Sequence, residues 1–213
     1  MDKKTSAHYQ REFRRRLREQ GLVKKEVWIR PENARLLSRA EKQLRLPGGG
    51  SKEVMGGVMV SEASAKNVSG NASEWTTRTL YKALKAESYF INGTAAIELI
   101  EGAEPSLHIV MREFGDLPVF ATVAGEQIIV ESVLWPQAEV NDVAGFNEAV
   151  LRTHKYFPLS TISLDRMEDG SDYYHMFGAL SAASSIADVV LEVEVLATNV
   201  IQATEAYGEF LKS

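Results

Sequence analysis

The sequence contains no cysteine, and this absence removes several kinds of chemistry at once. Disulfide bonds, thiolate metal sites and cysteine nucleophiles are all excluded. No run of about eighteen apolar residues occurs either, so the sequence predicts no membrane-spanning helix. The opening stretch MDKKTSAHYQREFRRR is charged and lacks the apolar core of a secretory signal. We therefore expect a cytoplasmic protein.

Recognisable catalytic and metal-binding patterns are also missing. The four histidines form no pair at i, i+4 and have no carboxylates at metal-ligand spacing: His8, His108, His154 and His175. Four acidic residues surround Gly170 but lack the ligand order of a calcium loop, and are typical of a polar hairpin tip: Asp165, Glu168, Asp169 and Asp172. No serine lies in a nucleophile elbow. We expect no enzyme, no catalytic residue, no cofactor and no metal site.

What the sequence does contain is a strong charge asymmetry. Residues 1–46 hold 14 Lys and Arg against 6 Asp and Glu, whereas residues 47–213 hold 10 against 23. A basic segment joined to an acidic one indicates an anionic partner for the basic part. Four partners fit this pattern: nucleic acid, a lipid surface, an acidic protein, or the acidic remainder of the same chain.

The pattern of residues 1–46 predicts a basic helix-strand-helix head. Tyr9, Phe13 and Leu17 recur at helical spacing, which predicts a helix over residues 6–20 that stops at Gly21. The alternation in KKEVWIR predicts a strand, and the proline that follows is suited to begin a second helix. The side chains that we assign to an anionic partner are Arg14, Arg15, Arg16, Arg18, Lys24, Lys25 and Arg30. Residues 47–73 are rich in Gly, Ser, Ala and Asn and predict a flexible linker.

Residues 74–213 predict an α+β body, in which an antiparallel sheet is flanked by helices. A helix capped by Ser73 is followed by three or four strands between residues 94 and 135. Asp142 then caps a helix, and a hairpin follows around the EDGS turn. The last element is a long helix over residues 184–211. Its VVLEVEV stretch also alternates like a strand, but the helical spacing extends far beyond the length of a strand.

Three aromatic residues of the body have two interpretations. Trp135 precedes a proline, and Tyr156 and Phe157 precede another. They fit an exposed groove for a partner peptide, and they equally fit ordinary core and corner packing. An edge strand of the sheet is a further place where a partner strand can add.

The run YQREFRRRLREQGLVKKEVWIRPENARLL resembles the start of the bacterial YjfI-type family. Genes of that family often neighbour relatives of phage-shock protein A, a membrane-stress coat protein, so the resemblance implies such a protein partner. The same run is similar to the opening of MazE-like antitoxins and ribbon-helix-helix DNA binders. That resemblance implies that Lys25, Val27 or Trp28, and Arg30 face or support the DNA groove. The chain departs from the pattern at LPGGGSK, where the next helix of a ribbon-helix-helix unit should begin.

The stretches FNEAVLRTHKYFPLSTISLD and DYYHMFGALS, with the long last helix, resemble type III secretion chaperones and YbjN-like proteins. Such proteins are dimeric protein-binding modules without catalysis. Our first hypothesis is therefore a cytoplasmic, homodimeric, chaperone-like adaptor with a protein partner. The alternative is a transcription regulator that binds DNA through residues 1–46. A third hypothesis is a protein that binds anionic lipid surfaces through the stripe of Tyr9, Phe13 and Leu17.

Overall fold

The computed structural model describes residues 5–27, 37, 40–41, 44–45 and 74–212. Residues 1–16 and 72–213 form one compact unit, here called the body unit, and residues 17–71 form another. The predicted linker 47–73 lies outside the described residues, and no strand occurs in residues 22–27. The start of the predicted head thus packs with the body, and the division into 1–46, 47–73 and 74–213 stays a prediction.

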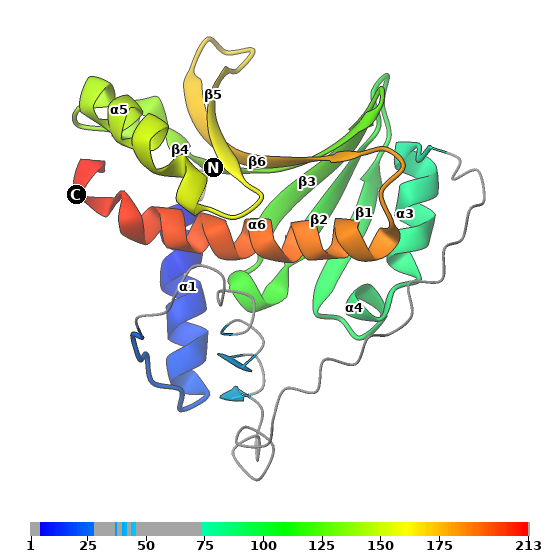
Figure 1. Ribbon diagram of the computed structural model, residues 1–213, viewed down its shortest axis with the longest axis horizontal. Helices are drawn as coiled ribbons and strands as arrows, with labels where there is room; N and C mark the ends of the chain where they lie inside the picture. Colours follow the sequence, from blue (N-terminus) through cyan, green and yellow to red (C-terminus); the bar gives the residue numbers. More distant parts are fainter. Residues whose placement is uncertain (1–4, 28–36, 38–39, 42–43, 46–73, 213) are drawn as a thin grey trace. The chain divides into compact units, whose positions relative to one another are not determined.

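A six-stranded antiparallel sheet with the order β1-β2-β3-β4-β6-β5 is the centre of the body unit (Figure 1). The strands are β1 Ala95–Ile100, β2 Ser106–Met111, β3 Leu117–Ala124, β4 Gln127–Pro136, β5 Thr161–Arg166 and β6 Asp172–Ser181. The helices are α1 Ser6–Glu19, α3 Thr77–Lys85, α4 Ser88–Ile91, α5 Val143–Thr153 and α6 Ile186–Ala206. Short 3-10 turns are η2 Arg112–Phe114, η3 Gln137–Glu139, η4 His154–Tyr156 and η5 Gly208–Phe210. The predicted fold class, an α+β protein with helices flanking an antiparallel sheet, is confirmed.

The strands form because apolar residues alternate along them, and the alternation divides the sheet into two different faces. One face packs against α6 and α3 and is fully buried, as at Leu107, Val119 and Val130. At one end of this core, Phe146 on α5 makes edge-on aromatic contacts with Trp135 and Tyr174. Within the described body unit, α3, α5 and α6 thus pack against the same face of the sheet.

The helix caps are local signals, and the cap of α5 was predicted correctly. Asp142 caps α5 by accepting a hydrogen bond from the Gly145 amide at 3.0 Å, and Ser185 caps α6. The VVLEVEV stretch is helical within α6, as predicted. The predicted cap of the first body helix was wrong: α3 is capped by Thr76, which forms a reciprocal capping box with Thr79. Two threonines at this spacing satisfy two backbone amides, which a lone serine does not.

Candidate protein-interaction surface

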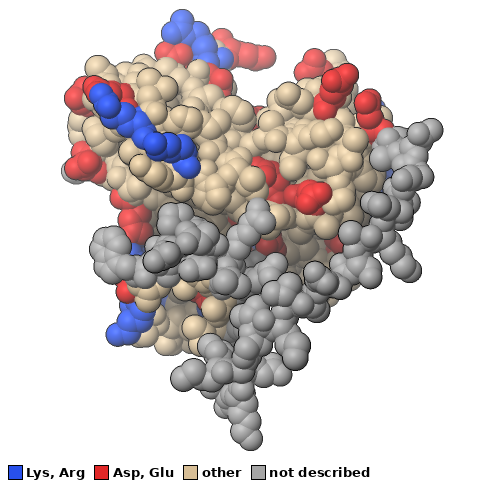
Figure 2. Space-filling view, in the orientation of Figure 1, with Lys and Arg blue, Asp and Glu red and all other residues tan. Residues whose placement is uncertain are grey.

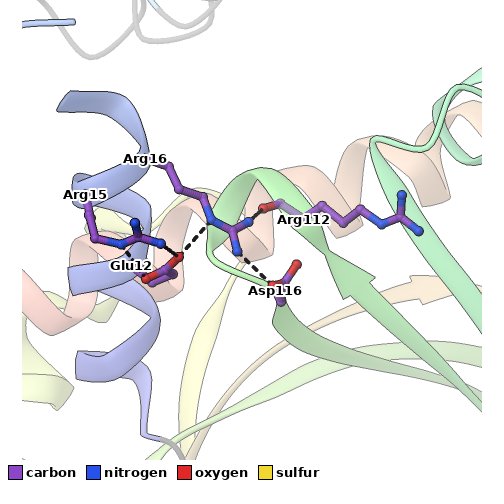
Figure 3. Close-up of polar contacts among 5 residues, drawn as sticks. All are labelled: Glu12, Arg15, Arg16, Arg112 and Asp116. Atoms are coloured by element: carbon purple, nitrogen blue, oxygen red, sulfur yellow. Dashed lines mark hydrogen bonds and ion pairs between the residues drawn. The ribbon is translucent and has the colours of Figure 1, made fainter. Parts of the chain in front are cut away.

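Three of the four predicted anion-binding arginines of α1 form ion pairs with acidic residues of the body unit: Arg14, Arg15 and Arg16. Arg16 contacts Asp116 at 2.8 Å and Glu12 at 3.0 Å, and also donates to the carbonyl oxygen of Arg112 (Figure 3). Hydrogen bonds from Arg15 and Arg16 lower the pKa of Glu12 to about 2. A carboxylate shared by two guanidinium groups stays ionised at any physiological pH, so the cluster is a permanent charge network.

The other predicted basic residues have different surroundings. Arg14 pairs with Glu205 on α6 at 2.9 Å. In the second unit, Lys24 pairs with Glu26 at 3.0 Å, and Arg18 and Lys25 have exposed side chains. Arg30 lies outside the described residues, as does Trp28. The structure therefore does not bring the seven predicted residues together into one described surface.

Apolar and buried contacts also hold the first half of α1 on the body. Phe13 stacks on Phe114, with ring centroids 5.4 Å apart, and the Gln10 side chain donates to the carbonyl oxygen of Ile201 at 3.3 Å. Gly115, at φ +78, allows this close approach, because a Cβ there would lie 2.9 Å from the Tyr9 carbonyl oxygen. Of the four partners that the charge asymmetry allowed, the chain's own acidic body is the one that Arg14 and Arg16 contact.

The three aromatic residues proposed as a partner groove are not gathered on one surface. Trp135 is 1% exposed and belongs to the core. Phe157 is half-buried against Tyr207, with ring centroids 6.0 Å apart, whereas Tyr156 is 73% exposed. Core packing, the second of the two interpretations, thus describes Trp135 and Phe157, and only Tyr156 is available to a partner.

A different surface, which the sequence analysis missed, lies on the side of the sheet away from α6. Strand residues on this side, here called the open face, are half-buried or exposed, with the exception of His175. In Figure 1 α6 runs along one side of the sheet, and the β5–β6 hairpin curls away from it. One row of the open face crosses all six strands, and each member pairs with the next: Glu98, His108, Phe120, Glu131, Phe177 and Thr161.

Contacts along this row fix its side chains. The His108 ring nitrogen Nδ1 lies 2.6 Å from the Glu98 carboxylate, and the His108 ring stacks on Phe120 with centroids 5.1 Å apart. The open face therefore presents aromatic and aliphatic side chains with carboxylates at several places among them. Figure 2 shows the side of the molecule on which α6 lies, and acidic side chains are scattered over the body there as well.

A buried histidine lies between two carboxylates on the open face. His175 is 9% exposed, and its Nδ1 lies 3.6 Å from Glu131 on β4 and 3.7 Å from Asp165 on β5. Neither ring nitrogen makes a hydrogen bond, although both are shielded from solvent. Asp165 accepts a hydrogen bond from Ser163 at 2.7 Å, which orients its carboxylate. A buried polar ring without partners is costly, so this position is a candidate for recognition.

The acidic hairpin tip does not gather its four carboxylates around Gly170. Asp172 pairs with Arg166 at 2.9 Å, and this guanidinium lowers the pKa of the carboxyl. Asp169 accepts from the Ser171 amide at 3.0 Å, as in a polar turn. Within the described residues, no group of three or more His, Asp or Glu is arranged to hold a metal ion, and no helix is long and apolar enough to cross a membrane.

The alternation of the strands held a signal for the open face. Glu131 follows the core residue Val130 in its strand, and His175 precedes the core residue Met176. Because successive side chains of a strand point to opposite faces, alternation alone places Glu131 and His175 on the open face. Their proximity depends on the register of β4, β6 and β5, which strand patterns do not specify.

The fold and its open face define an α+β protein whose sheet is covered by helices on one side. The chain belongs to the family described as "Uncharacterized protein conserved in bacteria (DUF2170)", whose model matches residues 74–211. It is similar to YjfI of Escherichia coli K12 and of Escherichia coli O157:H7, each 32% identical over 111 residues, which are 52% of this chain and 83% of the relative. The predicted YjfI-type family is confirmed.

Two solved structures are similar in part. YbjN of E. coli has 14% identity and a TM-score of 0.44, covering 64% of this chain and 93% of YbjN. An uncharacterized protein from Methanothermobacter thermautotrophicus has 12% identity and a TM-score of 0.45, covering 64% of this chain and 99% of that protein. Likenesses at this level carry no functional argument.

Proposed function

We propose that this protein is a non-enzymatic, cytoplasmic adaptor that binds a partner protein on the open face of its sheet. The observation that carries the proposal is the row from Glu98 to Thr161, which crosses every strand without a described helix over it. Aromatic residues are enriched at protein-binding surfaces, and polar residues form the rim around them. A homodimer and a partner related to phage-shock protein A are parts of the same proposal.

The engagement of α1 favours this adaptor over the DNA-binding alternative. Arg14 and Arg16 would have to give up Glu205 and Asp116 before they could contact phosphate. Nucleic-acid binding depends strongly on the number of such cations. A lipid surface meets a similar obstacle, because Tyr9 and Phe13 of the predicted membrane-facing stripe pack against the body.

Site-specific photo-crosslinking in cells tests the proposal. Phe120→p-benzoylphenylalanine and Phe177→p-benzoylphenylalanine place the reactive group on the open face, and Leu191→p-benzoylphenylalanine places it on the exposed side of α6 as a matched control. We expect both open-face probes to trap the same discrete protein, and the α6 probe not to trap it. Identification by mass spectrometry then shows whether that protein is a relative of phage-shock protein A.

Other outcomes separate the alternatives. Crosslinks from the open face that contain only a second copy of this chain would make the face a dimer interface instead of an adaptor surface. Equal trapping from Leu191, or none from Phe120 and Phe177, would overturn the proposal. Nucleic acid recovered with a further probe, Arg18→p-benzoylphenylalanine on the exposed side of α1, and not with the open-face probes, would favour the regulator.

A further inference from the structure

We propose that the open face recognises a basic segment of its partner, with an arginine or lysine side chain held between Glu131 and Asp165 beside His175. This inference rests on the adaptor function and specifies the chemistry of the partner.

The charge of the open face is the first argument. The strand positions that face away from α6 include the carboxylates of Glu98, Glu131 and Asp165, and they include no Lys or Arg. Glu98 already has a partner in His108, at 2.6 Å. The carboxylates of Glu131 and Asp165 therefore make the electrostatic potential beside His175 negative. A negative potential favours a cationic side chain of the partner.

The geometry around His175 is the second argument, and it is independent of the charge. Its Nδ1 lies 3.6 Å and 3.7 Å from the two carboxylates, which is beyond hydrogen-bond distance for both. A guanidinium carries five N–H donors in a planar fork, enough to bridge both carboxylates. One further donor can reach a ring nitrogen of His175, because an imidazole that carries a single N–H accepts a hydrogen bond at its other nitrogen. A bound cation thus supplies a hydrogen-bond donor to the buried ring, whose nitrogens have no hydrogen-bond partner.

Aromatic neighbours support the same guest. Phe177 pairs with Glu131, and Tyr173 pairs with Asp165, so each carboxylate has an aromatic residue on the adjoining strand. Cations bind favourably over aromatic rings, and the aliphatic stems of Arg and Lys pack on apolar surface. Phe120 extends the apolar floor away from the acidic position. The surface therefore fits a segment with basic and apolar side chains together, such as an amphipathic helix.

The same features disfavour other occupants. Phosphate groups of nucleic acid or lipid would meet Glu131 and Asp165, so both would be repelled. An acidic peptide would meet the same charges. A basic protein segment has a suitable charge, and its apolar side chains can also pack on the aromatic residues of the open face.

Peptide binding to the full-length chain tests the inference. The probe is a fluorescently labelled amphipathic helical peptide made of leucine and arginine, and its counterpart has glutamate in place of arginine. Fluorescence anisotropy compares the wild-type chain with Glu131→Gln, Asp165→Asn and the double variant. The control is Glu104→Gln with Glu209→Gln, which removes two exposed charges outside the open face. Circular dichroism confirms that each variant is folded.

We expect the wild-type chain to bind the arginine peptide and not the glutamate peptide. The double variant should bind about tenfold more weakly, each single variant should lie between, and the control should change binding less than about twofold. Equal weakening in the double variant and the control would mean general charge attraction and would overturn the inference. Failure of the wild-type chain to bind the arginine peptide would overturn it as well.

The crosslinking experiment distinguishes this failure from failure of the adaptor function. If the Phe120 probe traps its partner equally well after Glu131→Gln and Asp165→Asn are introduced, the partner binds the open face without the cation contact. The adaptor then stands and the inference falls. The opposite outcome is also informative. If the chain binds the arginine peptide, but the probes at Phe120 and Phe177 crosslink no protein in cells, the acidic site exists and the adaptor function is overturned.

Discussion

At the scale of single residues, the most unusual charge is buried between α6 and the sheet. Glu192 is 2% exposed, and its Oε1 makes no hydrogen bond. It fits there because the facing strand position is Gly178, where a Cβ would lie 1.7 Å from that oxygen. Burial raises the pKa of Glu192 from 4.5 to about 7, because the charged form loses its hydration. The helix therefore packs most firmly on the sheet when this carboxyl is protonated.

Replacement of this carboxyl by an amide should stabilise the protein at high pH. Since the pKa of Glu192 is higher in the folded than in the unfolded chain, its stabilising contribution is complete below about pH 4.5 and is lost as the pH rises through 7. At pH 8 we expect Glu192→Gln to raise the free energy of unfolding by about 2–3 kcal/mol, and the gain should vanish near pH 4.5. Urea unfolding across this range measures it.

Exposed Glu209→Gln serves as the control for that measurement, and its effect should not vary with pH. A gain from Glu192→Gln that is equal at pH 4.5 and pH 8 would contradict the assignment, because it would come from packing instead of ionisation.

At the scale of helices and strands, local signals predicted the elements, and long-range contacts escaped prediction. Gly21, at φ +75, ends α1, and the helical spacing in residues 184–211 correctly selected helix for α6. Docking of α1 could not be predicted in the same way. It depends on Phe13 meeting Phe114 and on Arg16 meeting Asp116, partners about 100 residues away, and charge asymmetry left four partners open. The open face was missed for a related reason: alternation assigns residues to faces, but register brings His175 beside Glu131 and Asp165.

The contact of α1 with the turn at Gly115 can be broken by one methyl group. Gly115→Ala combines a left-handed backbone with a Cβ 2.9 Å from Glu12 Cβ and from the Tyr9 carbonyl oxygen. Gly170→Ala is a matched control, because its φ of +79 is nearly the same and nothing lies within 4 Å. Both should lose about 1 kcal/mol through backbone strain, and Gly115→Ala should lose about 1–3 kcal/mol more through overcrowding.

Hydrogen exchange provides the specific readout for this pair of variants. Amides of residues 6–16 should exchange faster in Gly115→Ala than in Gly170→Ala, since only the first displaces the helix. The two variants could instead unfold at the same denaturant concentration and show equal protection of the α1 amides from exchange. In that case the close approach at Gly115 does not keep α1 packed on the body.

At the scale of the whole molecule, part of the charge asymmetry is internal. The basic start of the chain supplies Arg14 and Arg16, and the acidic body supplies Glu205 and Asp116. Each exposed pair contributes only about 0.2–1 kcal/mol, and salt weakens it. The apolar stacking of Phe13 on Phe114 is insensitive to salt, so ionic strength separates its contribution from that of the ion pairs.

Removal of residues 1–71 should therefore lower the free energy of unfolding of the body, and the loss should be larger at low salt than at high salt. We expect a chain of residues 72–213 to lose about 2 kcal/mol at low salt, and less at about 1 M salt, where the ion pairs no longer contribute.

A peptide of residues 5–19 added in trans should restore stability, because the surface of Phe114, Asp116 and Glu205 is intact. The same peptide with Phe13→Ala and Arg16→Ala should not restore it. Thermal unfolding measures all four samples, and equal stability of the long and short chains at both salt concentrations would show that α1 contributes nothing to the body.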